Sequence, residues 1–181
     1  MTPPPTALDT LYQAVRDATR TPSDRNTRVD AVTAAIRPRL PRPPDVLRCI
    51  PDHARQGHDR SQTLHVEPDG TFSIVALVTR PGQATSIHDH TAWCAVAIID
   101  GVEREERFRL GPTGAHLTRI GERVDRAGSV TGFAPPGDIH RVSNVGATVG
   151  ISLHIYGTDI RRTGSSVRRT YDLPVIPGDD E

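Results

Sequence analysis

Apolar positions near the N-terminus recur every three or four residues, a spacing typical of amphipathic helices. This spacing predicts a first helix over residues 6–20, with Thr6 as its N-cap. It predicts a second helix that begins at Ser23 or Asp24 and stops before Pro38, because proline cannot continue a helix. Two short helices are therefore expected to open the chain.

A proline-rich stretch separates these helices from a region of short strands. Residues 38–44 predict an extended linker, and residues 45–50 a short helical piece. From Thr63 onward, runs rich in apolar and β-branched residues alternate with turn signals. These runs predict strands over residues 72–78, 93–99, 104–110, 116–120, 129–133 and 149–156. So many short strands favour a sandwich or a small barrel.

The length of 181 residues suits one domain with a short extension. We expect residues 1–45 to form an N-terminal helical extension packed on a barrel, and residues 46–176 to form the barrel domain. Residues 177–181 are expected to be a frayed tail. The 16 prolines and 15 glycines divide the chain into short pieces, which suits a mainly β architecture better than a helical bundle.

Charge and cysteine content narrow the setting in which the protein works. The formal net charge is zero, so nothing electrostatic points to nucleic acid or to an anionic membrane surface. All 22 basic residues are arginine, which excludes lysine chemistry such as a Schiff base. The two cysteines make no disulfide framework, and the sequence shows neither a signal peptide nor a long apolar stretch. We therefore expect a cytoplasmic protein that is a monomer or a small homo-oligomer.

Three of the eight histidines stand in a pattern that suits metal binding. His88 and His90 are separated by one residue, and in a strand such residues point to the same face. Alone this pair is weak evidence, but a second block, residues 135–137 followed by His140, supplies a third imidazole. Three neutral imidazoles would hold a divalent metal with open positions, which suits Fe(II) and also zinc. Histidines in polar surroundings are expected on the surface, namely His53, His58 and His116.

Three segments in the same order resemble the cysteine dioxygenase family, the thiol dioxygenase branch of the cupin superfamily. They are Ser86–Thr91, Gly137–Asn144 and Ile151–Gly157, and they look closer to bacterial members such as 3-mercaptopropionate dioxygenases. The likeness to cupins in general spans roughly residues 63–156. It implies a cupin-type β-barrel or jelly roll that carries about two N-terminal helices. Cys94 stands where the first cupin motif usually has a glutamate.

The resemblance also implies a role for each residue of the site. Fe(II) would be held by the three histidines, and Tyr156, supported by His154 and Ser152, would orient substrate and O₂. Cys94 occupies the place where mammalian relatives join a cysteine to the matching tyrosine by a thioether. A Cys94–Tyr156 crosslink and a small buried core cysteine are both open alternatives. Trp93 is a candidate wall of the pocket, with a core role as the alternative.

The family binds the substrate carboxylate with an arginine in one of two places, because a guanidinium offers a two-pronged fork. At the upstream place this chain has Thr63 or a neighbour, with Arg60 three residues early. At the downstream place several arginines follow the tyrosine. We take Arg161 and Arg168 as candidates, and Arg162 and Arg169 are close by.

The resemblance therefore predicts a non-haem Fe(II) dioxygenase. It would oxidise a small thiol carboxylate of the cysteine or 3-mercaptopropionate class to its sulfinic acid with both atoms of O₂. The missing upstream arginine favours an alternative, a cupin oxygenase acting on a non-thiol amino acid or amine. A third alternative is a metal-binding cupin without catalysis. The expected partners are a small-molecule substrate and O₂, with no nucleic acid and no membrane.

Overall fold

The computed structural model describes residues 6–55 and 61–178. The predicted first helix is confirmed as α1 (Ala7–Thr19). It begins with a capping box in which Thr6 and Asp9 each accept a hydrogen bond from the backbone N–H of the other. The second is confirmed as α2 (Arg25–Ile36), capped by Asp24. Within residues 6–55 and 61–178, no helix is long and apolar enough to cross a membrane.

The prediction of an extended linker over residues 38–44 is wrong in part. Arg37–Arg39 form a 3₁₀ turn, η1, and Pro43–Leu47 form a short helix, α3, that starts earlier than expected. Both turns carry proline in their first two positions, where the missing N–H costs no helical hydrogen bond. Proline therefore starts these turns rather than preventing them.

The remainder of the described chain is mainly β, as predicted. Its first sheet has the strand order β1-β2-β9-β4-β7 and its second has the order β10-β3-β8-β5-β6-β11. The first sheet consists of β1 (Ser61–Val66), β2 (Ser73–Thr79), β4 (Cys94–Asp100), β7 (Val130–Phe133) and β9 (Gly150–Tyr156). The second consists of β3 (Ile87–His90), β5 (Val102–Leu110), β6 (Leu117–Arg126), β8 (His140–Asn144), β10 (Val167–Tyr171) and β11 (Val175–Ile176). A helical turn, α4 (Ile160–Thr163), connects β9 to β10.

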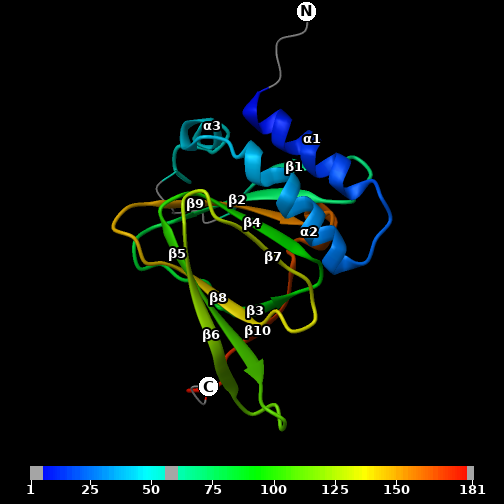
Figure 1. The fold of residues 1–181 in the computed structure, drawn as a ribbon. Helices are drawn as coiled ribbons and strands as arrows, with labels where there is room; N and C mark the ends of the chain where they lie inside the picture. The colour runs from blue at the N-terminus through cyan, green and yellow to red at the C-terminus, as the bar shows by residue number, and fades with distance from the viewer. Residues whose placement is uncertain (1–5, 56–60, 179–181) are drawn as a thin grey trace, which may run out of the picture.

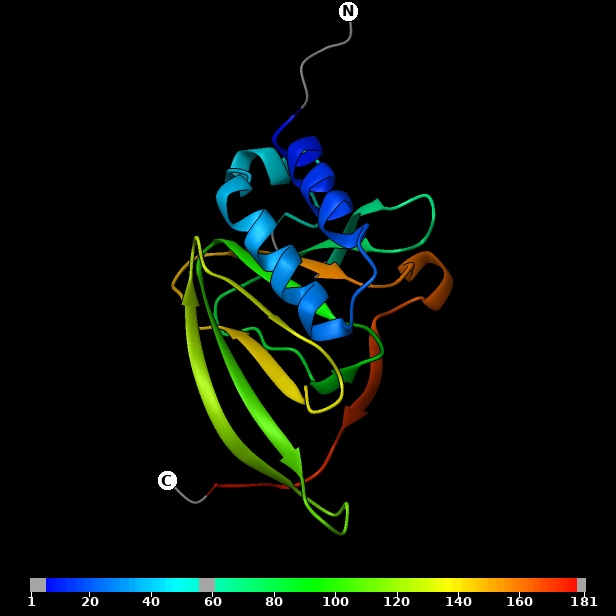
Figure 2. The same ribbon diagram turned by 45° about the vertical axis from the view of Figure 1, so that its right-hand side comes forward.

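The two sheets curl toward one another as the walls of a barrel, and the helices cover the outside of the first sheet (Figures 1 and 2). Alternate residues of its central strands pack under α1, α2 and α3 in the main hydrophobic core. The helices contribute Leu8, Leu11, Val15, Val29, Val32, Ile36 and Val46, and the strands contribute Ile74, Ala76, Ala95, Ala97, Leu153 and Ile155. The intervening residues face the barrel interior. Because the outer face of the sheet forms the hydrophobic core, its inner face can carry polar residues.

Helix α2 approaches the sheet closely at Gly132 on β7. A Cβ atom built there would lie 2.3 Å from Cγ1 of Val29, so only glycine allows this contact. We predict that Gly132→Ala lowers the free energy of unfolding by about 1–3 kcal/mol through overpacking. Val29→Ala should remove part of that penalty. Chemical denaturation of both single variants and the double variant measures the coupling, and strictly additive effects would argue against this packing.

Candidate metal centre

Three imidazoles converge inside the barrel from two distant parts of the chain. His88 and His90 lie on β3 and face the same side, and His140 at the start of β8 pairs in register with His88. The ring centroids of His88 lie 4.7 Å from those of both His90 and His140, and the latter two are 5.1 Å apart. One potential ligand atom of each ring lies within 4.8 Å of the other two. The side chains are nearly buried, as a shared metal ion requires.

Each ring is held through its Nδ1 atom by a group that accepts a hydrogen bond. The acceptor is the Ser86 carbonyl for His88 at 2.8 Å, Asp138 for His90 at 3.0 Å and Glu105 for His140 at 2.8 Å. A carbonyl or carboxylate only accepts, so each Nδ1 carries the proton and each Nε2 keeps a lone pair. Anchors of this kind fix the orientation of metal-binding histidines. The three rings thus meet the donor requirement of one metal ion.

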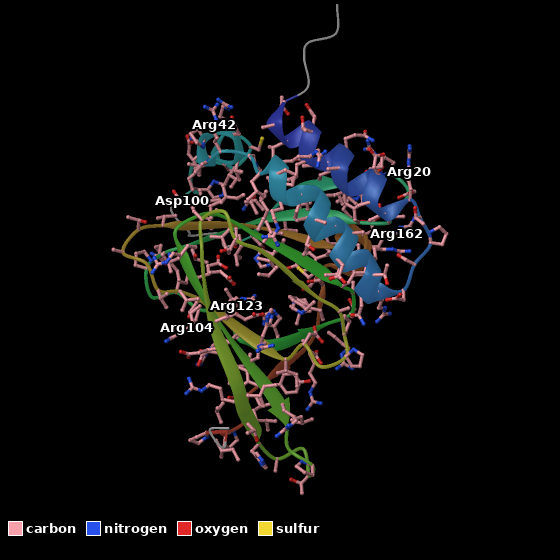
Figure 3. The ribbon with its side chains drawn as sticks, viewed as in Figure 1. Arg20, Arg42, Asp100, Arg104, Arg123 and Arg162 are labelled. Carbon is pink, nitrogen blue, oxygen red and sulfur yellow. The ribbon has the colours of Figure 1, made fainter. Side chains whose placement is uncertain are left out.

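The acidic anchors are themselves held in place. Asp138 also accepts a hydrogen bond from the backbone N–H of His90, at 2.9 Å. Arg123 on β6 pairs with Glu105 at 2.8 Å, and Figure 3 shows Arg123 beside the barrel wall. Although burial opposes the effect, hydrogen bonds from the histidines lower the pKa of both Glu105 and Asp138. Both anchors are therefore ionised at neutral pH.

The imidazoles of His88 and His90 are neutral at the same pH. Burial, followed by the neighbouring His140, lowers the pKa of His88 to about 4. Burial also lowers the pKa of His90. A neutral imidazole binds a metal without first losing a proton. Three imidazole nitrogen donors fit a divalent ion of the iron, cobalt or zinc type.

A hydrogen-bonded chain of three side chains runs along β9 on the inner face of the first sheet. Ser152 Oγ lies 3.1 Å from His154 Nε2, and the Tyr156 hydroxyl lies 3.3 Å from His154 Nδ1. Burial, and then the surrounding histidines, lower the pKa of His154 to about 3. Burial also raises the pKa of Tyr156. The structure thus connects the three residues that the sequence suggested as a chain, with the phenol protonated and the imidazole neutral.

A cavity of about 330 Å³ brings the two groups together. It is bounded by the three histidines of the candidate metal centre, by His154 and Tyr156, and by many hydroxyl-bearing and small apolar side chains. The hydroxyl groups belong to Ser61, Thr63, Thr85, Ser86, Ser165, Ser166 and Thr170. Within the described residues, no arginine lines this cavity. Its wall is therefore polar but carries few charges.

The candidate arginines are engaged elsewhere. Arg161 pairs with Asp159 at 3.3 Å, and Arg168 pairs with Asp89, which also accepts a hydrogen bond from Tyr171. The side chain of Arg162 is 87% exposed and lies at the periphery of the molecule (Figure 3). The guanidinium of Arg169 stacks on the Tyr171 ring. The structure does not bring these four guanidinium groups to the cavity.

Trp93 and Cys94 lie on either side of the first sheet. Trp93 is 4% exposed and packs in the main core, and it does not line the cavity. Cys94 is buried directly opposite Tyr156, in register between β4 and β9, so the two side chains share the inner face. Burial raises the pKa of the Cys94 thiol. Thr63, at the upstream arginine position, lines the cavity, whereas Arg60 and His58 lie outside the described residues.

Two anchors of the metal centre were not identified from the sequence. Asp138 stands two residues before His140 in the same motif, which is a local signal that could have suggested it. Glu105 gives no such signal, because its contact with His140 depends on the pairing of β5 with β8. An anchor created by strand pairing becomes visible only once the register is known.

A curled pair of sheets around three inward-facing histidines defines a metal-binding barrel of the cupin class. A family profile described as cysteine dioxygenase type I matches residues 53–163, which is more than half of the chain. The chain therefore belongs to the cysteine dioxygenase type I family.

Solved structures of other cupins resemble this chain only distantly. Oxalate decarboxylase from Bacillus subtilis is 25% identical over 50% of this chain, with a TM-score of 0.40. The match covers 22% of the oxalate decarboxylase chain, so this protein corresponds to a small part of that enzyme. A cupin 2 conserved barrel domain protein from Salinispora arenicola CNS-205 is 21% identical, with a TM-score of 0.45. That match covers 64% of this chain and 92% of the other.

The carboxylate anchors predict a specific effect on metal affinity. Replacing Asp138 by Asn or Glu105 by Gln should weaken Fe(II) binding by about 10–100-fold, because a neutral amide replaces the charged carboxylate that orients the imidazole and increases its basicity. Competition with a chromophoric chelator under anaerobic conditions measures the affinity. Glu106→Gln is the matched control, since Glu106 lies on the same strand but pairs with Arg141. Equal affinity in all four proteins would show that the carboxylates do not support the metal centre.

Proposed function

We propose that this protein is an Fe(II)-dependent thiol dioxygenase that converts a small thiol to its sulfinic acid. The reaction adds both atoms of O₂ to sulfur, so that R–SH and O₂ give R–SO₂H. The observation that carries the proposal is the position of the Tyr156 hydroxyl, at the end of the Ser152–His154 chain, in the cavity that contains the three histidines. Membership of the cysteine dioxygenase type I family supports the same reaction.

The protein's own residues have distinct tasks in this reaction. His88, His90 and His140 would hold the ferrous ion through Nε2, and their Nδ1 anchors keep them in place. When bound, the ferrous ion would supply open coordination positions for a thiolate and O₂ and a path for electrons between them, while the four electrons that reduce O₂ come from the sulfur. Tyr156 offers a neutral phenol that hydrogen-bonds to a reactant, and the barrel wall excludes bulk water.

We propose a small thiol carboxylate, of the cysteine or 3-mercaptopropionate class, as the substrate. A cavity of about 330 Å³ is suited to a molecule of this size. Hydroxyl groups of Thr63 on β1 and of Ser165 and Ser166 before β10 line the same cavity and can donate hydrogen bonds to a carboxylate. Such contacts would replace the arginine fork used elsewhere in the family.

One observation favours a second candidate, an oxygenase that acts on a non-thiol amino acid or amine. Neutral hydroxyl and apolar groups dominate the cavity wall among the described residues, and they do not select strongly for a carboxylate. A panel of substrates separates the two candidates. Oxygen uptake with thiols supports the first, and uptake with amino acids or amines alone supports the second.

Tyr156→Phe should lower the rate of thiol oxidation by about 10–100-fold while the iron content stays unchanged. The variant loses one hydrogen bond to a reactant and no metal ligand. An oxygen electrode measures the rate, and metal analysis measures the iron. Tyr12→Phe is the control, because Tyr12 is a partly buried tyrosine on α1 that stacks on His65 outside the cavity. Unchanged turnover in the Tyr156 variant would contradict the assigned role.

The neighbouring positions of Cys94 and Tyr156 lead to a proposal that can be checked by mass alone. We propose that aerobic turnover joins the two residues by a thioether, with O₂ as the oxidant that accepts the two hydrogen atoms lost from the chain. Intact-mass analysis after aerobic turnover should show this loss in the wild type and in Cys49→Ser, whose altered cysteine is exposed. Cys94→Ser should not show it. An unmodified mass after extended turnover would identify Cys94 as a core cysteine only.

A further inference from the structure

A buried carboxyl group ends the Ser–His–Tyr chain on the side away from the cavity. Glu103, on β5, is 4% exposed, and its carboxyl group contacts the Ser152 hydroxyl. Its Oε1 atom has no hydrogen-bond partner among the described residues. At the opposite end, the Tyr156 hydroxyl contacts the side chain of Ser166, and both residues line the cavity. A continuous path of polar side chains therefore runs from Glu103 through His154 to the cavity.

The surroundings of Glu103 favour its protonated form. On β6, Asp125 lies opposite Glu103 in register, and Glu105 lies two residues along β5, so the charged groups acting on it are both negative. On β8 the opposite residue is the neutral Asn144. Burial, and then these two carboxylates, raise the pKa of Glu103 to about 7 in spite of the hydrogen bond from Ser152. The group thus exchanges its proton near neutral pH.

The proton on Glu103 allows one direction of hydrogen bonding along the chain that the ionised group forbids. His154 is neutral and carries a single N–H, so it donates at one nitrogen and accepts at the other. When Glu103 is protonated, its hydroxyl can donate to Ser152, and Ser152 then donates to His154 Nε2. His154 Nδ1–H then donates to the Tyr156 oxygen, and the phenol proton points toward Ser166 and the cavity.

Loss of the proton reverses this order. Ionised Glu103 only accepts, so Ser152 donates to it and takes a hydrogen bond from His154 Nε2–H. His154 Nδ1 is then an acceptor, and the phenol proton of Tyr156 turns toward it and away from the cavity. The two arrangements differ by one proton, which leaves to solvent, and by the tautomer of His154.

We propose that Glu103 is a positioning residue whose protonation state decides whether Tyr156 donates a hydrogen bond into the cavity. The effect on turnover rests on the proposed thiol dioxygenase reaction, but the reversal itself is a property of the protein without metal. Within that reaction, the protonated form of Glu103 is the active one, because only then does Tyr156 donate to a reactant.

Infrared difference spectroscopy of the metal-free protein tests the reversal directly. Raising the pH through about 7 should remove the carbonyl band of one protonated carboxylic acid. With the same midpoint it should shift the phenol C–O band of Tyr156, which differs between donating and accepting hydroxyl groups. Glu103→Gln should lack both changes, and Tyr156→Phe should lack the second. Ser152→Ala interrupts the path and should keep the carboxylic band while losing the tyrosine response.

Turnover provides the second readout. The quantity to follow is the ratio of the wild-type kcat/KM for thiol oxidation to the kcat/KM of Glu103→Gln. This ratio should fall by about tenfold as the pH rises through the Glu103 midpoint, because the wild type then loses one hydrogen bond to a reactant. Glu106→Gln, on the same strand, should keep the wild-type profile. If the wild type oxidises no thiol, the proposed function fails, and the infrared titration still decides the role of Glu103.

Two results would overturn the inference. One is a carboxylic band that is absent from the wild type below neutral pH or that persists in Glu103→Gln, since it would then belong to another residue. The other is a Tyr156 band that does not respond when Glu103 titrates. If Glu103→Gln does not fold, the comparison of wild type with Ser152→Ala decides the same question.

Discussion

The structure depends on the way in which three imidazole rings are anchored through Nδ1. Each ring could turn about its side-chain bonds, and a shared ion requires all three Nε2 atoms to face one point. The anchors come from separate places: the Ser86 carbonyl before β3, Asp138 before β8 and Glu105 on β5. The metal centre therefore exists only when β3, β5 and β8 are paired in their observed register. Folding of the second sheet and assembly of the site are one event.

The first sheet can carry a polar inner face because its outer face carries the core. Helices α1 and α2 bury the apolar side of β2, β4 and β9, and the residues between them on each strand point into the barrel. Burial then shifts the pKa of the inner groups. It lowers the pKa of His154 and raises that of Tyr156, so both stay neutral, and it raises the pKa of Glu103 to about 7. The helical layer thus contributes to the chemistry without reaching the cavity.

Much of this arrangement could be predicted from the sequence, and the limits have physical causes. The two N-terminal helices, most of the strands and the pairing of His88 with His90 follow from local periodicity. The strands β1, β8, β10 and β11 were not among the predicted ranges, because they are short and their residues do not alternate clearly. The arginine candidates came from the family pattern, which does not record that Asp159 and Asp89 pair with them. Glu103 and Glu105 owe their environments to strand register, which no local pattern contains.

X-ray absorption spectroscopy of the iron-loaded protein tests the convergence of the three rings most directly. We predict a ferrous ion whose ligands include three imidazole nitrogens, with the remaining positions filled by exchangeable oxygen ligands such as water. His140→Ala should reduce the imidazole contribution or abolish iron binding, because His140 comes from the second of the two distant segments. If the number of imidazole ligands were unchanged in His140→Ala, iron would bind elsewhere. That result would contradict the convergence of the three histidines on one ion.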